Sequence, residues 1–180
     1  MNITRRHIRV AAFASALAVL LQIAPVSTGG QPNGNRPVTV TFAKWTTGVT
    51  TATVLGNVQE GRVLMAGVAG GDVAGGTFVG EVLQRQPSAN SALKSGIVKL
   101  EAIYEIHDAE GDHVFTALIR GGANATGAAL LDGVILAGWR TGAPVHVEFK
   151  TVVGCDGAPT PATTCFVGTI EVGRTTKGNN

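Results

Sequence analysis

The chain has 180 residues, of which 44% are hydrophobic and 14% charged, and its formal net charge is +2. This length and composition fit one domain with its own hydrophobic core, and they exclude a disordered chain and a coiled coil. Glycine is abundant at 25 residues and aromatic residues are scarce at 5%. That mixture favours strands and tight turns over long helices.

The first 29 residues have the order of a secretory signal peptide. Three arginines precede an apolar run at 10–21, and small residues follow Pro25. The apolar run is shorter than the roughly 20 residues that span a bilayer, so we expect cleavage near Gly29 rather than an uncleaved anchor. The pattern predicts a secreted or periplasmic protein and leaves the Sec and twin-arginine routes open.

Removal of this segment changes the charge balance of the chain. It leaves 11 basic against 12 acidic residues, a net charge of −1. Such a chain lacks the basic patch that nucleic acid binding requires, so we expect no nucleic acid partner and no membrane association after cleavage. Residues 30–36 are predicted to be a flexible leader, 37–174 the folded domain, and 175–180 a disordered tail.

Alternation of apolar and polar residues predicts strands along the whole folded domain. The clearest alternation lies at 98–107, where one face carries Val98, Leu100, Ala102, Tyr104 and Ile106. A polar turn at 108–112 makes this strand and the next a hairpin. The best helical candidate, 88–94, has one or two turns at most. The eight expected strands are 38–44, 63–68, 77–84, 98–107, 113–120, 128–137, 145–153 and 166–172.

Short strands joined by glycine-rich turns predict an all-β fold. We expect a single antiparallel β-barrel of about eight strands, with a β-sandwich as the alternative. The sandwich alternative lacks the Cys…Trp…Cys spacing of immunoglobulin domains.

Two sequence patterns occur twice in the same order. The pattern A-x-W-x-T-G occupies 43–48 and 137–142, and each copy precedes a V-x-G-x-D segment and an F-V-G segment. The repeated order predicts that Trp45 and Trp139 close equivalent strand ends.

The only two cysteines, Cys155 and Cys165, flank one short loop in the second copy. This loop is four residues longer than its counterpart, and an exported protein matures where thiols oxidise, so we expect a disulfide. A zinc site is less favoured because the usual C-x₂₋₄-C spacing is absent. Alternation places the cysteines on opposite faces. This predicts a bulge at Gly154 or Gly168, or cysteines just beyond the last ladder pair.

Sequence motifs for phosphate, dinucleotide or catalytic metal sites are absent, so we expect no cofactor and no metal. Asp108, Glu110 and Asp112 alternate as in a calcium loop, but the glycine is misplaced and the distal glutamate is missing. We interpret this segment as a polar hairpin turn.

The corners at 76–80 and 164–168, with Phe78 and Phe166 between small residues, resemble those of the allene oxide cyclase and dirigent superfamily. The resemblance covers residues 37–174 in pattern. It implies a closed barrel whose central apolar cavity positions a small hydrophobic molecule or radical. No catalytic residue of these families matches a position in this chain.

Small inward-facing residues favour an open space inside the barrel, because packing to native density needs volume that they do not supply. The candidate pocket residues are Ala102, Tyr104, Trp45 and Trp139, with Arg140 at the mouth. The alternatives are a tyrosine at the barrel lip and tryptophans that plug the ends. We expect an exported module that binds a small apolar molecule. An isomerase or cyclase acting in the cavity, and an extracellular structural or interaction protein, remain alternatives.

Overall fold

The computed structural model describes residues 36–55, 58–73, 75–87 and 96–174. The predicted signal peptide, the leader up to residue 35, the short helical candidate and the C-terminal tail lie outside these residues. Within the described residues there is no helix long and apolar enough to cross a membrane.

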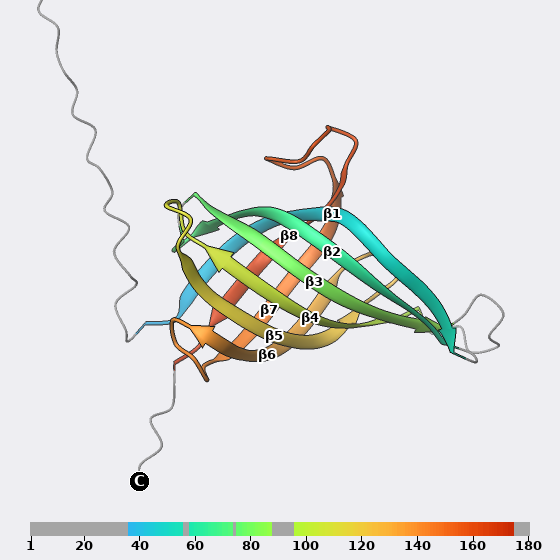
Figure 1. Ribbon diagram of the computed structural model, residues 1–180, viewed down its shortest axis with the longest axis horizontal. Coiled ribbons are helices and arrows are strands. Elements are labelled where there is room, and N and C mark those ends of the chain that lie inside the picture. Colours follow the sequence, from blue (N-terminus) through green and yellow to red (C-terminus); the bar gives the residue numbers. More distant parts are fainter. Residues whose placement is uncertain (1–35, 56–57, 74, 88–95, 175–180) are drawn as a thin grey trace, which may run out of the picture.

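Eight strands form one closed antiparallel barrel, which confirms the predicted fold class over the sandwich (Figure 1). Each strand pairs with its neighbours along the chain, and the last strand closes the barrel by pairing with the first. The strands are β1 (Val38–Leu55), β2 (Val58–Gly71), β3 (Gly76–Pro87), β4 (Val98–His107), β5 (His113–Ala123), β6 (Ala129–Gly138), β7 (Pro144–Val153) and β8 (Thr164–Val172).

Every predicted strand is present, but several are longer than the alternation indicated. The largest difference is in β1, which was expected to end at Lys44 and continues to Leu55. Its second half is rich in threonine and carries two register shifts against β2, so no regular apolar face marks it in the sequence. In Figure 1 the ends of β1, β2 and β3 extend together past the rest of the barrel.

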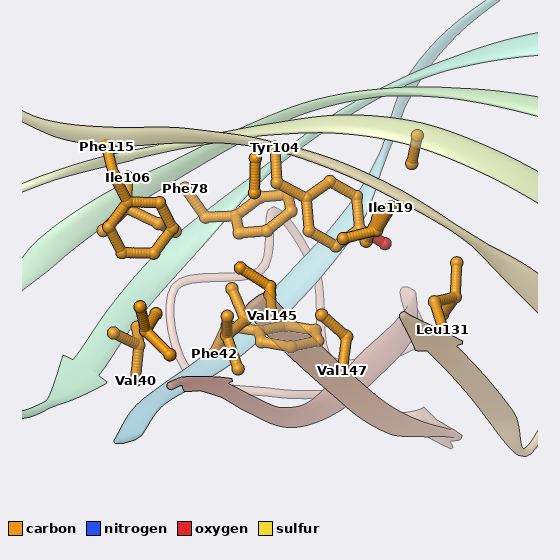
Figure 2. Close-up of a cluster of buried hydrophobic side chains, with 14 of the residues drawn as sticks. Val40, Phe42, Phe78, Tyr104, Ile106, Phe115, Ile119, Leu131, Val145 and Val147 are labelled. Atoms are coloured by element: carbon orange, nitrogen blue, oxygen red, sulfur yellow. The ribbon is translucent and has the colours of Figure 1, made fainter. Parts of the chain in front are cut away.

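The two ends of the barrel are filled differently. The end that carries the β2–β3, β4–β5 and β6–β7 turns is called here the packed end, and the opposite end is called the cavity end. Side chains that fill the packed end are at most 3% exposed: Val38, Val40, Ile106, Phe115, Ile135, Val145 and Val172. Several of them form one cluster in Figure 2.

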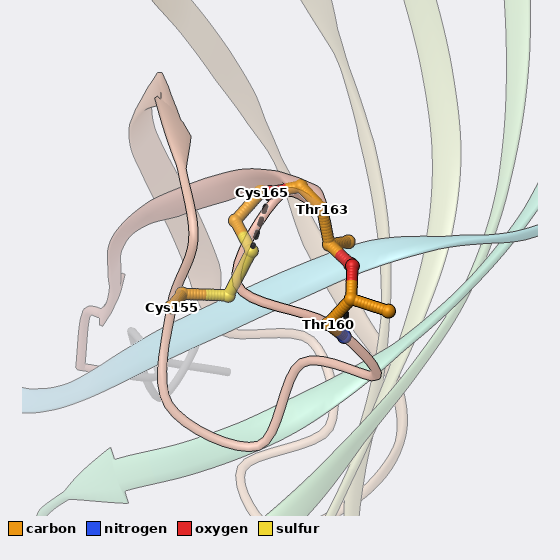
Figure 3. The surroundings of a disulfide bond; sticks show 4 residues. All are labelled: Cys155, Thr160, Thr163 and Cys165. Carbon is orange, nitrogen blue, oxygen red and sulfur yellow. Dashed lines mark hydrogen bonds between the residues drawn. A yellow bond between two sulfur atoms is a disulfide. The ribbon is translucent and has the colours of Figure 1, made fainter.

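A disulfide joins Cys155 of the β7–β8 loop to Cys165 of β8, as predicted (Figure 3). The β7–β8 ladder runs without a register shift, and Cys165 pairs with Val152 inside it. Cys155 lies beyond the end of β7, after Gly154, whose φ of 74° turns the chain. A change of chain direction past the ladder, rather than a bulge, therefore brings the two sulfurs together.

The two tryptophan patterns are not equivalent, so that prediction is wrong. Trp45 lies inside β1, between Ala66 of β2 and Cys165 of β8. Trp139 lies just after the end of β6, where the chain turns at Arg140 with a φ of 56°. The motifs differ because β1 continues through its bulges past Trp45, whereas β6 stops before Trp139.

Candidate functional site

The barrel interior contains a lysine. Alternation along β1 turns Val38, Val40 and Phe42 inward, and Lys44 continues the same face. Lys44 is 1% exposed and is the one polar or charged residue in the buried set of the described chain. Burial of an amine at this position is unusual, because lysine is almost never fully buried unless it is paired.

The partner of Lys44 is Tyr104, whose hydroxyl is hydrogen-bonded to the lysine Nζ. Tyr104 comes from β4 and is 1% exposed. Its ladder partner on β3 is Gly80, where a β-carbon would lie 2.9 Å from the Phe78 ring and 3.3 Å from the Tyr104 ring. Glycine at this position leaves room for both rings. Figure 2 shows the Tyr104 hydroxyl directed away from Phe115, toward the cavity end.

Four aromatic rings surround the amine and form what is called here the aromatic cage. The lysine Nζ lies 3.8 Å from the ring centroid of Tyr104, 4.6 Å from Phe149, 5.0 Å from Phe42 and 5.1 Å from Phe78. The rings also pack against one another, with Phe42 and Phe78 stacked at 5.4 Å. They come from β1, β3, β4 and β7, so the cage joins strands from both sides of the barrel.

Burial shifts the titration of both polar groups toward their neutral forms. Desolvation lowers the pKa of the Lys44 amine well below its ordinary value and raises the pKa of the Tyr104 phenol. The ring faces attract an ammonium, by up to about 2 kcal/mol per desolvated contact. Burial of an ammonium among apolar side chains carries a large desolvation cost, and this cost accounts for the lowered pKa of Lys44.

A cavity of about 230 Å³ lies beside this pair at the cavity end of the barrel. Most of its lining is apolar, including Met65, Val82, Val98, Leu100, Phe149 and Phe166. Its polar side chains are Lys44, Tyr104, Gln84 and Thr151. An apolar space with a few convergent polar groups is typical of a small-molecule site.

Of the residues predicted from the sequence to form a pocket, Tyr104 lines this cavity. Ala102 shares the inner face of β4 and is 2% exposed, between the lining residues Leu100 and Tyr104, but it does not itself line the cavity. Trp45 points to the outer face of the wall. Gly157 of the disulfide loop lies next to this side chain, because a β-carbon added at Gly157 would be 3.4 Å from the Trp45 indole.

Trp139 and Arg140 lie at the packed end, away from the cavity. The Arg140 guanidinium stacks 4.3 Å from the centroid of the Trp139 ring. It also donates hydrogen bonds to the backbone carbonyls of Arg36, at 2.6 Å, and of Gly173, at 3.1 Å. These contacts join the β6–β7 turn to the segments just before β1 and just after β8. Arg140 therefore holds these segments together, and it does not lie at the mouth of the pocket as predicted.

Sequence reasoning missed Lys44, although a signal for it exists. The predicted strand at 38–44 places Lys44 on the same face as Val38, Val40 and Phe42, which is the face that must turn inward. A lysine that ends an apolar face normally marks the point where a strand leaves the core, because its stem can reach water. Here β1 continues past Lys44 and keeps it inside.

The described residues hold no group of three or more His, Cys, Asp or Glu side chains arranged to bind a metal ion. The titratable groups among the residues that line the cavity are one amine and one phenol, which can donate and accept hydrogen bonds and exchange a proton. The chain matches no protein-family model, no curated protein and no solved structure.

Proposed function

We propose that this protein binds a small apolar molecule inside the barrel, with a polar group of the molecule against Lys44 and Tyr104. The observation that carries the proposal is the cavity of about 230 Å³ that has this buried pair on its wall. An apolar cavity of about 150 Å³ is large enough for benzene. The space in this barrel therefore suits a single ring with a short substituent, or a short chain.

The disulfide supports a location outside the reducing cytosol. Bonds of this kind form and persist in oxidising compartments. Together with the basic, apolar and small-residue order of residues 1–29, it supports export of the protein to the periplasm or the medium. A ligand would then be captured outside the cell membrane.

Catalysis on the bound molecule is the second candidate function. A phenol that is hydrogen-bonded to an amine beside an apolar cavity is suited to an isomerase or cyclase that acts on a small hydrophobic substrate. The resemblance to allene oxide cyclase and dirigent barrels supports the same class. A purely structural role is less favoured, because a filled interior would serve it as well as a cavity.

Binding is tested by calorimetry with benzyl alcohol, a probe of suitable size with one polar group. The cavity-lining Val98 and the 42% exposed Ile103 lie on inner and outer faces of the same strand. We expect one molecule of benzyl alcohol to bind per chain. Val98→Phe should weaken binding by about tenfold or more, a loss of about 1.4 kcal/mol, because the added ring occupies the space.

The matched control, Ile103→Phe, adds the same ring to the outer face and should leave binding unchanged. Native mass spectrometry of protein purified from its own host would show whether a retained molecule already occupies the cavity. Absence of binding for benzyl alcohol and for hydrocarbon probes of similar size would refute the proposal. Equal weakening by both phenylalanine variants would also refute it, since it would place the site outside the barrel.

A further inference from the structure

Lys44 lines the cavity, and its side chain is buried. Asp and Glu are absent from the described residues that line the cavity, and the amine is hydrogen-bonded to the Tyr104 hydroxyl. We propose that Lys44 forms a reversible imine with an apolar aldehyde held in the cavity, and that Tyr104 supplies the proton for this step. The inference rests on the proposed binding function and adds to it the chemical class of the ligand.

The surroundings of Lys44 favour a nucleophilic amine. A lysine desolvated in an apolar pocket is a recognised form of activated nucleophile, because only the unprotonated amine attacks a carbonyl. The titratable residues among those that line the cavity are Lys44 on β1 and Tyr104 on β4; the other strands contribute apolar side chains and the neutral Gln84 and Thr151. Burial lowers the pKa of the amine below its ordinary value, which favours the unprotonated form that attacks a carbonyl.

The step balances without any oxidant or added co-reactant. The Lys44 nitrogen forms a bond to the aldehyde carbon, and its proton passes to the carbonyl oxygen to give a carbinolamine. Tyr104 then donates its proton to the hydroxyl group, the C–O bond breaks, and water leaves. The nitrogen loses its remaining proton to the Tyr104 phenolate as the C=N bond forms. Hydrolysis by the reverse path releases the aldehyde.

The position of the pair explains why the aldehyde should be apolar and small. Phe42 and Phe78 of the aromatic cage are not part of the cavity lining, whereas Tyr104 and Phe149 line the cavity of about 230 Å³ together with Lys44. We expect a ligand to approach the amine from the cavity. An aldehyde carbon that meets Nζ must therefore place the rest of its molecule among Met65, Leu100 and Phe166. A carboxylic acid of the same size would require an ammonium, which this environment disfavours.

The experiment uses benzaldehyde as the probe and cyanoborohydride as the trapping reagent at neutral pH. We expect native mass spectrometry to show one adduct per chain that has lost water, and reduction to fix one benzyl group on Lys44. Peptide mapping locates the group. The exposed Lys99 and Lys150 serve as internal controls and should be labelled much more slowly than Lys44, because neither lines the cavity beside Tyr104. Benzyl alcohol should compete with labelling.

Two variants separate the roles of the pair. Lys44→Met should abolish the adduct, because it removes the amine that attacks the carbonyl. Tyr104→Phe should still form the adduct but more slowly, by about 10²-fold, the lower range for a lost general acid. Lys44 of the wild type should be labelled faster than the exposed Lys99 at neutral pH, because burial lowers the pKa of the Lys44 amine.

The outcomes distinguish this inference from the function on which it rests. If benzyl alcohol binds but benzaldehyde leaves Lys44 unmodified, the imine is wrong and the binding function stands. If Lys44 and Lys99 are labelled equally, or if benzoate binds with proton uptake in place of adduct formation, the imine is also wrong. If no probe enters the cavity, both proposals fail.

Discussion

The environment of Lys44 couples the stability of the fold to pH. Its amine is enclosed by aromatic rings, and burial lowers its pKa in the folded state. In the unfolded chain the same amine is hydrated and has a pKa near 10.4. At pH values between the folded-state pKa and the unfolded-state pKa of Lys44, the unfolded state binds one more proton than the folded state. The free energy of unfolding must therefore rise with pH in this range.

Replacement of Lys44 by methionine should remove this dependence. Methionine has a similar length and no titratable group. We expect the free energy of unfolding of the wild type, relative to Lys44→Met, to fall by up to about 1.4 kcal/mol for each pH unit below about 10.4. The slope is unaffected by pH-independent costs, such as the lost hydrogen bond to Tyr104. Urea unfolding of both proteins across neutral and alkaline pH measures it.

Tyr104 provides an internal check in the alkaline range. Burial raises its pKa in the folded state, whereas the unfolded phenol ionises near pH 10. Above about pH 10 the unfolded state therefore holds fewer protons, and stability should fall with pH in both Lys44→Met and the wild type. Parallel curves for the two proteins below pH 10 would show that Lys44 is charged in the folded state.

At the scale of single elements, the β7–β8 loop depends on its covalent bridge. Cys155 lies outside the ladder, and the loop brings Gly157 so close to the outer wall that a β-carbon there would meet Val68 and Trp45. A ring of this size restricts the conformations of the unfolded chain. If the effect of a disulfide is treated as entropic, this restriction stabilises the folded state by roughly 2.5–3 kcal/mol. The bridge stabilises the loop and, through it, the cover over Trp45.

The double variant Cys155→Ala/Cys165→Ala should lower the free energy of unfolding by about 2–3 kcal/mol and leave the barrel intact. Trp45 should also become more exposed, because the loop that covers it is released. In a Trp139→Phe background only Trp45 emits, so fluorescence during urea unfolding reports both effects. Reduced wild-type protein should behave like the double variant. An unchanged emission maximum in both would show that the loop stays in place without the bridge.

The strands themselves could be predicted, because alternation marks every segment with one buried face. β4 was predicted with its observed bounds, since Val98, Leu100, Ala102, Tyr104 and Ile106 alternate with mostly polar residues. The end of β1 could not be predicted, because its second half pairs through bulges and lacks a regular apolar face. Hydrogen bonds to β2 hold the second half of β1 in place, and such pairing produces no alternation of apolar and polar residues that the sequence could reveal.

For the site, the sequence identified Tyr104 but not its partner. Tyr104 stands out as the only tyrosine, on the inner face of the clearest strand. Its proximity to Lys44 depends on closure of β8 onto β1, which brings strands distant in sequence around one interior. The prediction that Trp45 and Trp139 close equivalent strand ends was also wrong. Similar motifs do not determine whether a strand continues, as β1 does, or ends, as β6 does.

At the scale of the whole molecule, the barrel combines a solid half with a hollow half. Closure removes the exposed sheet edges, so the wall itself needs no further cover. The packed end supplies a continuous core, and the Lys44–Tyr104 pair lies where that core meets the cavity. This division explains how a small barrel can keep a buried amine: the packed half supports the strands that position it.

Two matched substitutions on β5 should separate the halves. Ala117 lies 1% exposed between Phe115 and Ile119, whereas Ala123 lines the cavity on the same strand. Ala117→Leu should lower the free energy of unfolding by about 1–3 kcal/mol, because the packed half has no room for three more carbons. Ala123→Leu should be neutral or stabilising, because it fills empty space, and should weaken benzyl alcohol binding. Urea unfolding and calorimetry of the two variants measure both effects. Equal destabilisation by the two substitutions would mean that the interior is filled at both ends. Equal tolerance would mean that the packed end is loosely packed. Only a barrel with one solid and one hollow half should respond to the same substitution in opposite ways.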